Sequence, residues 1–266
     1  MKRNLYIYNK VVTRLVMGLL PFYLFTFLPL NADAKKQKQL VVLHTNDTHS
    51  TIMPLNPNLE NQDIAGRAGF LRRISMIKEE RKQNPDLLLF DSGDFSQGSG
   101  YYTLFKGEVE IGLMNEMGYD AATIGNHEFD FGMDNMAKLF RMANFPIVCS
   151  NYDCKGTVLE DLVKPYITLR RGDVKIGVFA LAPKLKGLVF DGNCEGITFL
   201  DPAETAQKYI DLLRKQEKCD LVLGGHTHTY MPTLEYTPDK NGKRIPVDQN
   251  GKHAAFVGKL VLNLEK

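Results

Sequence analysis

Carboxylate, imidazole and amide side chains recur in four short segments of this chain, in spacings that suit metal ligands. The segments are Asp47-Thr48-His49, Gly93-Asp94, Gly125-Asn126-His127 and Gly224-Gly225-His226-Thr227-His228. Asp47 and His49 are two positions apart, so on an extended chain both side chains point to the same side and can reach one cation. Any one segment alone also fits a solvated strand end, but four such ends by accident are improbable.

The types of side chain indicate which metals these segments would bind. Oxygen and imidazole nitrogen ligands without thiolate favour Mn, Fe, Zn, Co or Mg over a structural zinc–thiolate site. Asp94 lies in a glycine-flanked turn, where a carboxylate can approach two cations at once, so we interpret it as a bridging ligand.

Each segment follows, after at most three residues, a short apolar run that is typical of a buried strand. The runs cover residues 40–43, 86–90, 121–124 and 221–223. Open α/β sheets bind ligands beyond the carboxyl ends of their strands. The sequence therefore predicts that the four segments meet at one edge of a sheet.

Helical and extended segments alternate along the rest of the chain. Helices are predicted at 66–81, 108–117, 133–143 and 202–215, a further strand at 147–150, a β-hairpin at 166–181 and a final strand at 255–264. Residues 50–65 are predicted to form a loop. This alternation favours a layered α/β domain, and no repeat or long linker divides residues 35–266.

These motifs, with Gln97-Gly98-Ser99 and Glu128-Phe129-Asp130, resemble the calcineurin-like metallophosphoesterases. The closest resemblance is to the N-terminal catalytic domain of secreted 5′-nucleotidases and UDP-sugar hydrolases, and it covers nearly all of residues 35–266. The implied fold is a four-layer αββα sandwich, in which helices cover the outer faces of two packed sheets.

The resemblance also implies two divalent metal ions and a catalytic pair. It assigns Asp47, His49, Asp94 and His228 to one cation. It assigns Asp94, Asn126 and His226 to the second cation, with Asp94 shared. His127 and Asp130 match the family's pair, in which the carboxylate orients an imidazole that stabilises charge on the phosphoryl group.

The implied activity is the hydrolysis of phosphate esters by metal-activated water, with nucleoside monophosphates or UDP-sugars as substrates. Nucleotidases of this kind usually carry a nucleoside-binding C-terminal domain, so we expect either that a separate chain supplies that domain or that the substrate is bound by its phosphate end alone. A phosphodiesterase or a sulfate-ester hydrolase is a weaker alternative on the same scaffold.

One part of the family pattern is missing. A Ser-His-x-Gly segment normally follows the helix that is predicted to end here near residue 215, and its histidine completes the second metal site. This chain passes from Cys219 and Asp220 to Gly224 through three residues. We therefore expect the sandwich to lack one strand and one helix. A catalytically impaired metal- or nucleotide-binding protein, or half of a two-chain nucleotidase, is the alternative function.

The first 34 residues have the order of a secretory signal, with four cations before an apolar run and Ala32-Asp33-Ala34 at its end. Two prolines interrupt this run of 16 residues, so a cleaved signal is favoured over a stable membrane span. The formal net charge of +2 includes these four cations and Asp33, so residues 35–266 carry a formal charge of −1. This charge gives no support for nucleic-acid binding. We expect an exported protein, periplasmic or extracellular.

Four cysteines in such a compartment permit one or two disulfides. Three further residues beside the motifs are given structural roles. Strand alternation turns His44 away from the site, His253 lies in a predicted surface turn, and Glu128 is expected to serve a helix start.

Overall fold

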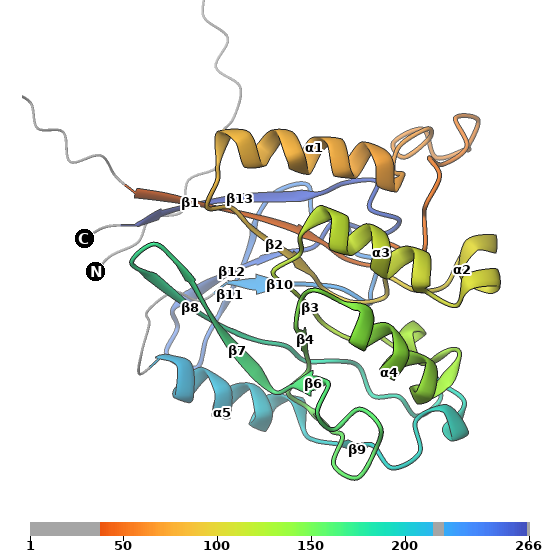
Figure 1. The fold of residues 1–266 in the computed structure, drawn as a ribbon. Helices are drawn as coiled ribbons and strands as arrows, with labels where there is room; N and C mark the ends of the chain where they lie inside the picture. The colour runs from red at the N-terminus through yellow and green to blue at the C-terminus, as the bar shows by residue number, and fades with distance from the viewer. Residues whose placement is uncertain (1–37, 215–220, 265–266) are drawn as a thin grey trace, which may run out of the picture.

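A six-stranded sheet in the order β13-β1-β2-β3-β4-β6 carries the site (Figure 1). The computed structural model describes residues 38–214 and 221–264. The strands are β1 (Lys38–Thr45), β2 (Leu88–Asp91), β3 (Ala121–Ala122), β4 (Ile147–Val148), β6 (Val163–Lys164) and β13 (Gly258–Leu264). Strands β1, β2, β3, β4 and β6 are parallel neighbours, whereas β13 is antiparallel to β1. The carboxyl ends of β1, β2 and β3 therefore lie at one edge.

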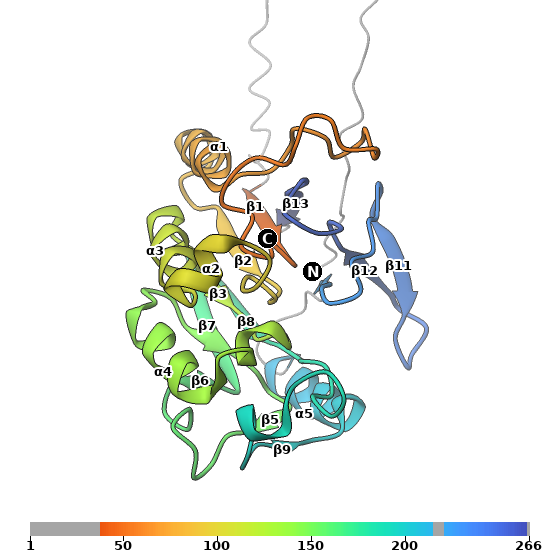
Figure 2. The same cartoon turned by 90° about the vertical axis from the view of Figure 1, so that its right-hand side faces the viewer.

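Helices α1 (Phe70–Gln83), α3 (Glu108–Met117) and α4 (Gly132–Met142) cover one face of this sheet (Figure 2). Helix α2 (Gly100–Phe105) lies beyond the ends of the strands (Figure 1). Apolar side chains at helical spacing, such as Ile77 and Ile111, pack against Leu43, Leu89 and Ile124 of the sheet, and all five are at most 1% exposed. Burial of this apolar surface is the main force that holds the helices on the sheet.

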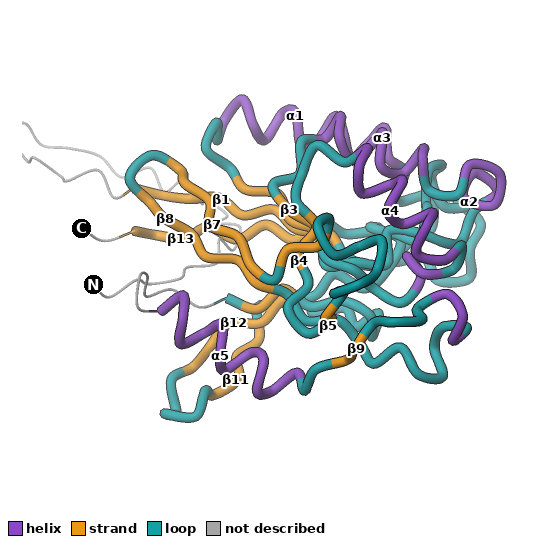
Figure 3. The backbone as a smooth tube through the Cα atoms, turned by 60° about the horizontal axis from the view of Figure 1, so that its bottom comes forward, coloured by secondary structure: helices purple, strands orange, loops and turns teal. Residues whose placement is uncertain are grey.

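The other face of the sheet is covered by strands in two separate groups (Figure 3). One is the hairpin of β7 (Tyr166–Arg171) and β8 (Val174–Phe179), and the other has the order β10-β12-β11, with β10 (Val222–Leu223), β11 (Glu235–Pro238) and β12 (Arg244–Asp248). Both groups pack on a second, smaller core that contains Leu40, Val42 and Leu88. Helix α5 (Pro202–Arg214) covers the hairpin, where Tyr209 contacts the rings of Tyr166 and Phe179.

The remaining elements are short. Strands β5 (Tyr152–Asp153) and β9 (Thr198–Phe199) form a two-stranded sheet, and single 3-10 turns occur at η1 (His127–Phe129) and η2 (Asp191–Asn193). Along the chain, η1 lies between β3 and α4.

The mixed α/β architecture with helices outside two strand layers confirms the predicted fold class. The helix predicted at 108–117 is observed with those bounds, and it ends at Gly118, whose φ of 68° suits a left-handed cap. The helix predicted to start at residue 66 starts at Phe70 instead, because Gly69 has a φ of 94°. Helix α2 was not predicted. The predicted loss of one strand and one helix stays a prediction, because residues 215–220, which include Cys219 and Asp220, lie outside the described residues.

Two other predictions also concern residues outside 38–214 and 221–264. The signal predicted at residues 1–34 lies outside the described residues, as does Cys219. The three described cysteines, Cys149, Cys154 and Cys194, are free thiols. No helix within residues 38–214 and 221–264 combines the length and apolar character needed to cross a membrane.

Candidate metal centre

The loops that follow β1 and β2 are joined by backbone hydrogen bonds. Asp47 N–H donates to the carbonyl of Gly93 at 2.9 Å, and His49 N–H donates to the carbonyl of Asp94 at 3.0 Å. Ser50 N–H continues this ladder to the carbonyl of Phe95 at 2.9 Å. The two parallel strands thus continue as paired loops, and this pairing fixes Asp47 and His49 beside Asp94.

Glycines allow the next loop, after β3, to approach equally closely. A Cβ added at Gly125 would lie 2.1 Å from Asp94 Oδ1, and one added at Gly93 would lie 2.8 Å from the backbone nitrogen of Gly125. Gly225 has a similar role, because a Cβ there would lie 2.6 Å from the carbonyl oxygen of Ser92. Side chains at these positions would force the loops apart.

Five of the predicted ligands have left-handed backbone conformations. The residues, with φ between 44° and 66°, are Asp47, His49, Asp94, His226 and His228. Each such residue costs about 1 kcal/mol or more, and backbone strain of this kind is concentrated at functional sites. The surrounding ladder and glycine contacts are what hold these residues in place.

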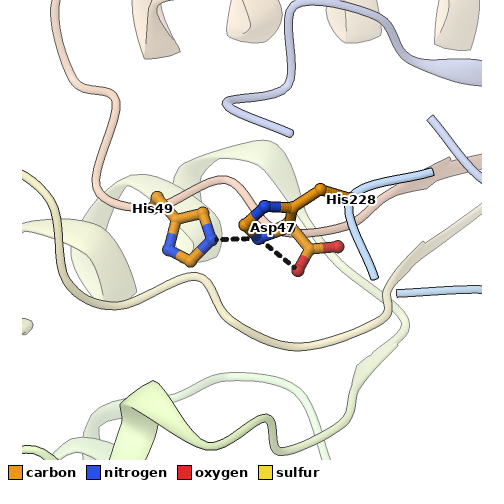
Figure 4. Close-up of side chains that lie close together, drawn as sticks. All are labelled: Asp47, His49 and His228. Carbon is orange, nitrogen blue, oxygen red and sulfur yellow. Dashed lines mark hydrogen bonds and ion pairs between the residues drawn. The ribbon is translucent and has the colours of Figure 1, made fainter. Parts of the chain in front are cut away.

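Asp47, His49 and His228 form a compact cluster, which Figure 4 shows in close-up. One ligand atom from each residue lies within 4.8 Å of the others. His49 Nε2 is 2.9 Å from His228 Nε2, and His228 Nε2 is 3.4 Å from Asp47 Oδ1. Asp47 is fully buried and also accepts hydrogen bonds from Asn46 Nδ2 at 2.6 Å and from His226 N–H at 3.0 Å.

The charges in this cluster fit a bound cation. Burial raises the pKa of Asp47 to about 7, with the nearby carboxylate of Asp94 adding to the rise, and burial lowers the pKa of His49 to about 4. His49 Nδ1 is buried without a hydrogen-bond partner among the described residues. A divalent cation would stabilise the negative charge of the buried Asp47 carboxylate, and it would accept the lone pairs of the neutral imidazoles.

Asp94 and His226 lie together on the other side of this cluster. Asp94 Oδ2 is 3.7 Å from His226 Nδ1, and Asp94 Oδ1 accepts a hydrogen bond from His127 N–H at 3.0 Å. Asn126 is buried, at 6% exposure, in the loop that contacts Asp94. The structure therefore brings the three residues assigned to the second cation to the same edge of the sheet.

The predicted catalytic pair is formed as well. His127 Nδ1 is 3.2 Å from Asp130 Oδ2 across η1, and the side chains are 31% and 36% exposed. The hydrogen bond with Asp130 raises the pKa of His127 above its usual value. The imidazole is thus oriented by a carboxylate, is biased toward the protonated form, and remains accessible to a substrate.

Glu128 has a role that the sequence interpretation missed. It was expected only to serve a helix start, but its buried carboxylate accepts three backbone hydrogen bonds from two loops. The donors are Gly125 N–H at 2.6 Å, Asp94 N–H at 3.1 Å and Ser96 N–H at 3.1 Å. Glu128 therefore fastens the loop after β2 to the loop after β3, and its place in the Gly-Asn-His-Glu segment was the only available signal.

Substitution of Glu128 should weaken both the fold and the binding of metal. In Glu128→Ala, three buried donors lose their acceptor, which costs about 3 kcal/mol at ~1 kcal/mol each. For a domain of this size that corresponds to a fall in Tm of about 6–12 °C. Glu128→Gln keeps one acceptor oxygen and should fall between wild type and Glu128→Ala in a thermal melt and in a Mn²⁺ titration. Equal Tm values for all three proteins would contradict this role.

His253 was predicted to lie on the surface, and that prediction is wrong. Its backbone N–H donates to the carbonyl of Asp47 at 2.7 Å, and its half-buried ring lies 6.0 Å from the ring of His49. His253 Nδ1 is 3.1 Å from Thr51 Oγ1. Gly251 and Asn250 tie the same turn to Asn46, so a turn near the C-terminus forms a wall of the site. No pattern in the sequence indicated this long-range contact.

His44 has the structural role expected of it. Its ring is fully buried on β1, and Nε2 lies 2.9 Å from Asp248 Oδ2 on β12. This pair connects the central sheet to the second strand layer. It lies on the opposite side of β1 from the chemistry.

In this chain, buried carboxylates and imidazoles lie together at the carboxyl ends of parallel strands. This arrangement is typical of α/β proteins that bind metal ions at the edge of a sheet. Within that class, the chain belongs to the calcineurin-like phosphoesterase family, whose family model matches residues 40–230.

Several characterised proteins are similar to this chain. Bovine 5′-nucleotidase is 30% identical over 247 residues, which cover 81% of this chain and 42% of the bovine protein. The crystal structure of a 5′-nucleotidase precursor from Thermus thermophilus superposes with a TM-score of 0.77 at 25% identity, covering 86% of this chain and 52% of that one. The calcineurin-like phosphoesterase YfkN from Bacillus subtilis gives a TM-score of 0.67 at 26% identity, over 86% of each chain.

The length that is shared differs among these proteins. The chain spans less than half of the first two curated relatives, 45% of a snake venom 5′-nucleotidase from Gloydius brevicauda and 42% of the bovine protein. The similarity therefore concerns the phosphoesterase domain described here.

Proposed function

We propose that this chain hydrolyses phosphate monoesters, with 5′-nucleotides as the preferred class. The observation that carries the proposal is the convergence of Asp47, His49 and His228 beside the His127–Asp130 pair. The family membership and the 5′-nucleotidase relatives support the same chemistry.

The residues present fit one divalent cation and supply three of the ligands for a second. Asp47, His49 and His228 would hold the first cation with Asp94, while Asp94, Asn126 and His226 would hold the second. When bound, such cations bind phosphate oxygens, lower the pKa of a water molecule and stabilise both ends of an in-line displacement.

The His127–Asp130 pair would supply the acid–base chemistry of the reaction. His127, held by Asp130, donates a hydrogen bond or proton where negative charge develops on the phosphoryl group or leaving oxygen. The paired loops keep the ligands in position, so little reorganisation is needed when substrate binds.

The test of the proposed function is phosphate release from AMP by the purified chain in the presence of Mn²⁺, Co²⁺, Zn²⁺ or Mg²⁺. We expect turnover that is abolished by a chelator and restored by metal. A folded protein that binds metal but releases no phosphate from AMP or 4-nitrophenyl phosphate, and does not cleave UDP-glucose to UMP and glucose 1-phosphate, would instead favour the catalytically impaired alternative.

The two metal sites are expected to differ in affinity. The first has a carboxylate and two imidazoles whose ligand atoms lie within 4.8 Å of one another. The second has Asp94, Asn126 and His226, and it lacks the histidine of the Ser-His-x-Gly segment that completes this site in the family pattern. Calorimetric titration with Mn²⁺ should therefore resolve one tight and one weaker equivalent, separated by at least about tenfold in Kd. Two equivalents of equal affinity would contradict this expectation.

We also propose that the chain is exported, because its N-terminal segment has the order of a secretory signal. Fractionation of cells that express the full chain, followed by N-terminal sequencing of the product, tests the export and the predicted cleavage after Ala34.

A further inference from the structure

An apolar pocket lies next to the metal centre. Its volume is about 480 Å³, within the range of sites that bind small molecules. Three segments form its walls: the loop after His49, helix α2 with the residues before it, and the C-terminal turn at His253. The side chains that matter here are Met53, Tyr101, Leu104, Phe105 and His253.

The pocket lies beside the proposed catalytic site. Ser50 and Thr51 line it and directly follow His49, and the ring of His253 lies 6.0 Å from the ring of His49. Gly98 and Ser99 line both this pocket and a second hollow of about 450 Å³ that extends to Asp130. A molecule beside the catalytic pair can therefore reach across Gly98 and Ser99 into the apolar pocket.

The lining indicates what kind of group would bind there. Tyr101 is 41% exposed, Phe105 47% and Leu104 75%, although all three are large apolar residues beside a polar site. Among the described residues, the lining contains no Lys, Arg, Asp or Glu, so a second phosphate or a charged group would find no partner. Aromatic side chains favour an aromatic ligand, which can stack on them or contact their edges.

The polar side chains of the lining are already hydrogen-bonded to one another. Ser50 Oγ bonds Ser99 Oγ and the buried carboxylate of Glu110, and Thr51 Oγ1 bonds His253 Nδ1. A hydroxyl-rich sugar would have to compete with these bonds. An aromatic ring would leave them intact.

We propose that this pocket binds the aromatic ring of a phosphate ester, such as the base of a nucleoside monophosphate, while the phosphate lies at the metal centre. This assignment rests on the proposed function. The phosphoesterase domain would then have a base-binding subsite of its own, and apolar contact would give weak discrimination between purines and pyrimidines.

Gly100 offers a direct way to fill the pocket. It lines the pocket at the first position of α2, a Cβ added there meets no atom within 4 Å, and its φ is not positive. Leucine can therefore replace it without backbone strain, and its side chain would occupy the pocket. Gly112 in α3 is a matched control, because it is also a helical glycine with open space at its Cβ but lies outside the pocket.

The experiment compares AMP with ribose 5-phosphate, which has the same phosphate and sugar but no base. In Gly100→Leu, kcat/KM for AMP should fall about tenfold, while the value for ribose 5-phosphate should stay within about twofold of wild type. Gly112→Leu should leave both values unchanged. Equal loss with both substrates, or no loss with AMP, would overturn the proposal.

A binding measurement separates this proposal from the proposed function. Adenosine is titrated into the metal-free protein, and amide chemical shifts are followed by NMR. Saturable shifts at Tyr101 to Phe105 that disappear in Gly100→Leu but persist in Gly112→Leu support the pocket even if no ester is hydrolysed. Absence of such shifts in the wild-type protein would reject it even if AMP is hydrolysed.

Discussion

Asp94→Asn is expected to lower kcat/KM for AMP by about 10³-fold or more, the scale seen when one charge-stabilising group is lost from an active site. Asp94 lies between the two proposed cations, 3.7 Å from His226 and in the loop that is paired with His49. The substitution keeps the size of the side chain but removes the negative charge that both cations require. Metal-dependent turnover of AMP, measured as phosphate release, gives the value.

A control is needed because Asp94 is buried at 2% exposure and its substitution could disturb the loops. Asp134→Asn, at an exposed position in the first turn of α4, removes the same charge outside the proposed site and should have wild-type activity. The far-ultraviolet circular dichroism of both variants should match wild type. Activity of Asp94→Asn within tenfold of wild type would contradict the bridging role.

His127→Ala should reduce kcat by about 10²–10⁴-fold, the usual contribution of general acid–base catalysis. His127 is not assigned as a metal ligand, and its ring is 31% exposed, so the loss should come with little change in Mn²⁺ affinity or Tm. Steady-state kinetics at saturating AMP, together with a Mn²⁺ titration, separates the two effects.

Asp130→Asn provides a graded comparison for the same pair. It keeps a hydrogen-bonding group near His127 Nδ1, 3.2 Å away in the wild type, but removes the carboxylate charge. Its loss of kcat should therefore be smaller than that of His127→Ala, about tenfold or more. If His127→Ala instead abolished Mn²⁺ binding, the imidazole would have to be reassigned as a ligand.

The elements that carry the site could be predicted because local signals specify them. Apolar runs of strand length precede each group of ligands, and Gly118 marks the end of α3, so the order of the strands that end in ligands was evident, although α2 was not. The parallel pairing of β1, β2 and β3 then follows from the alternation, and it brings Asp47, Asp94 and Asn126 to one edge.

The contacts that were missed depend on residues far apart in the sequence. His253 lies 204 positions after His49, and its approach depends on the pairing of β1 with β13 and on hydrogen bonds to Asn46. Glu128 was underestimated for a related reason, because two of its three hydrogen-bond donors belong to the loop after another strand. Backbone angles such as the φ of 47° at Asp47 also arise from these contacts rather than from local preference.

The first proposed cation site is built from both ends of the described chain, since Asp47 and His49 follow β1 while His228 follows β10, 179 residues after His49. Contacts of such long range form late in folding, because the intervening chain must be ordered before they can be made. During synthesis, the emerging chain has Asp47 and His49 but not His228. The choice of metal would then be made where the whole chain folds, and for an exported protein that place lies beyond the cytoplasmic membrane.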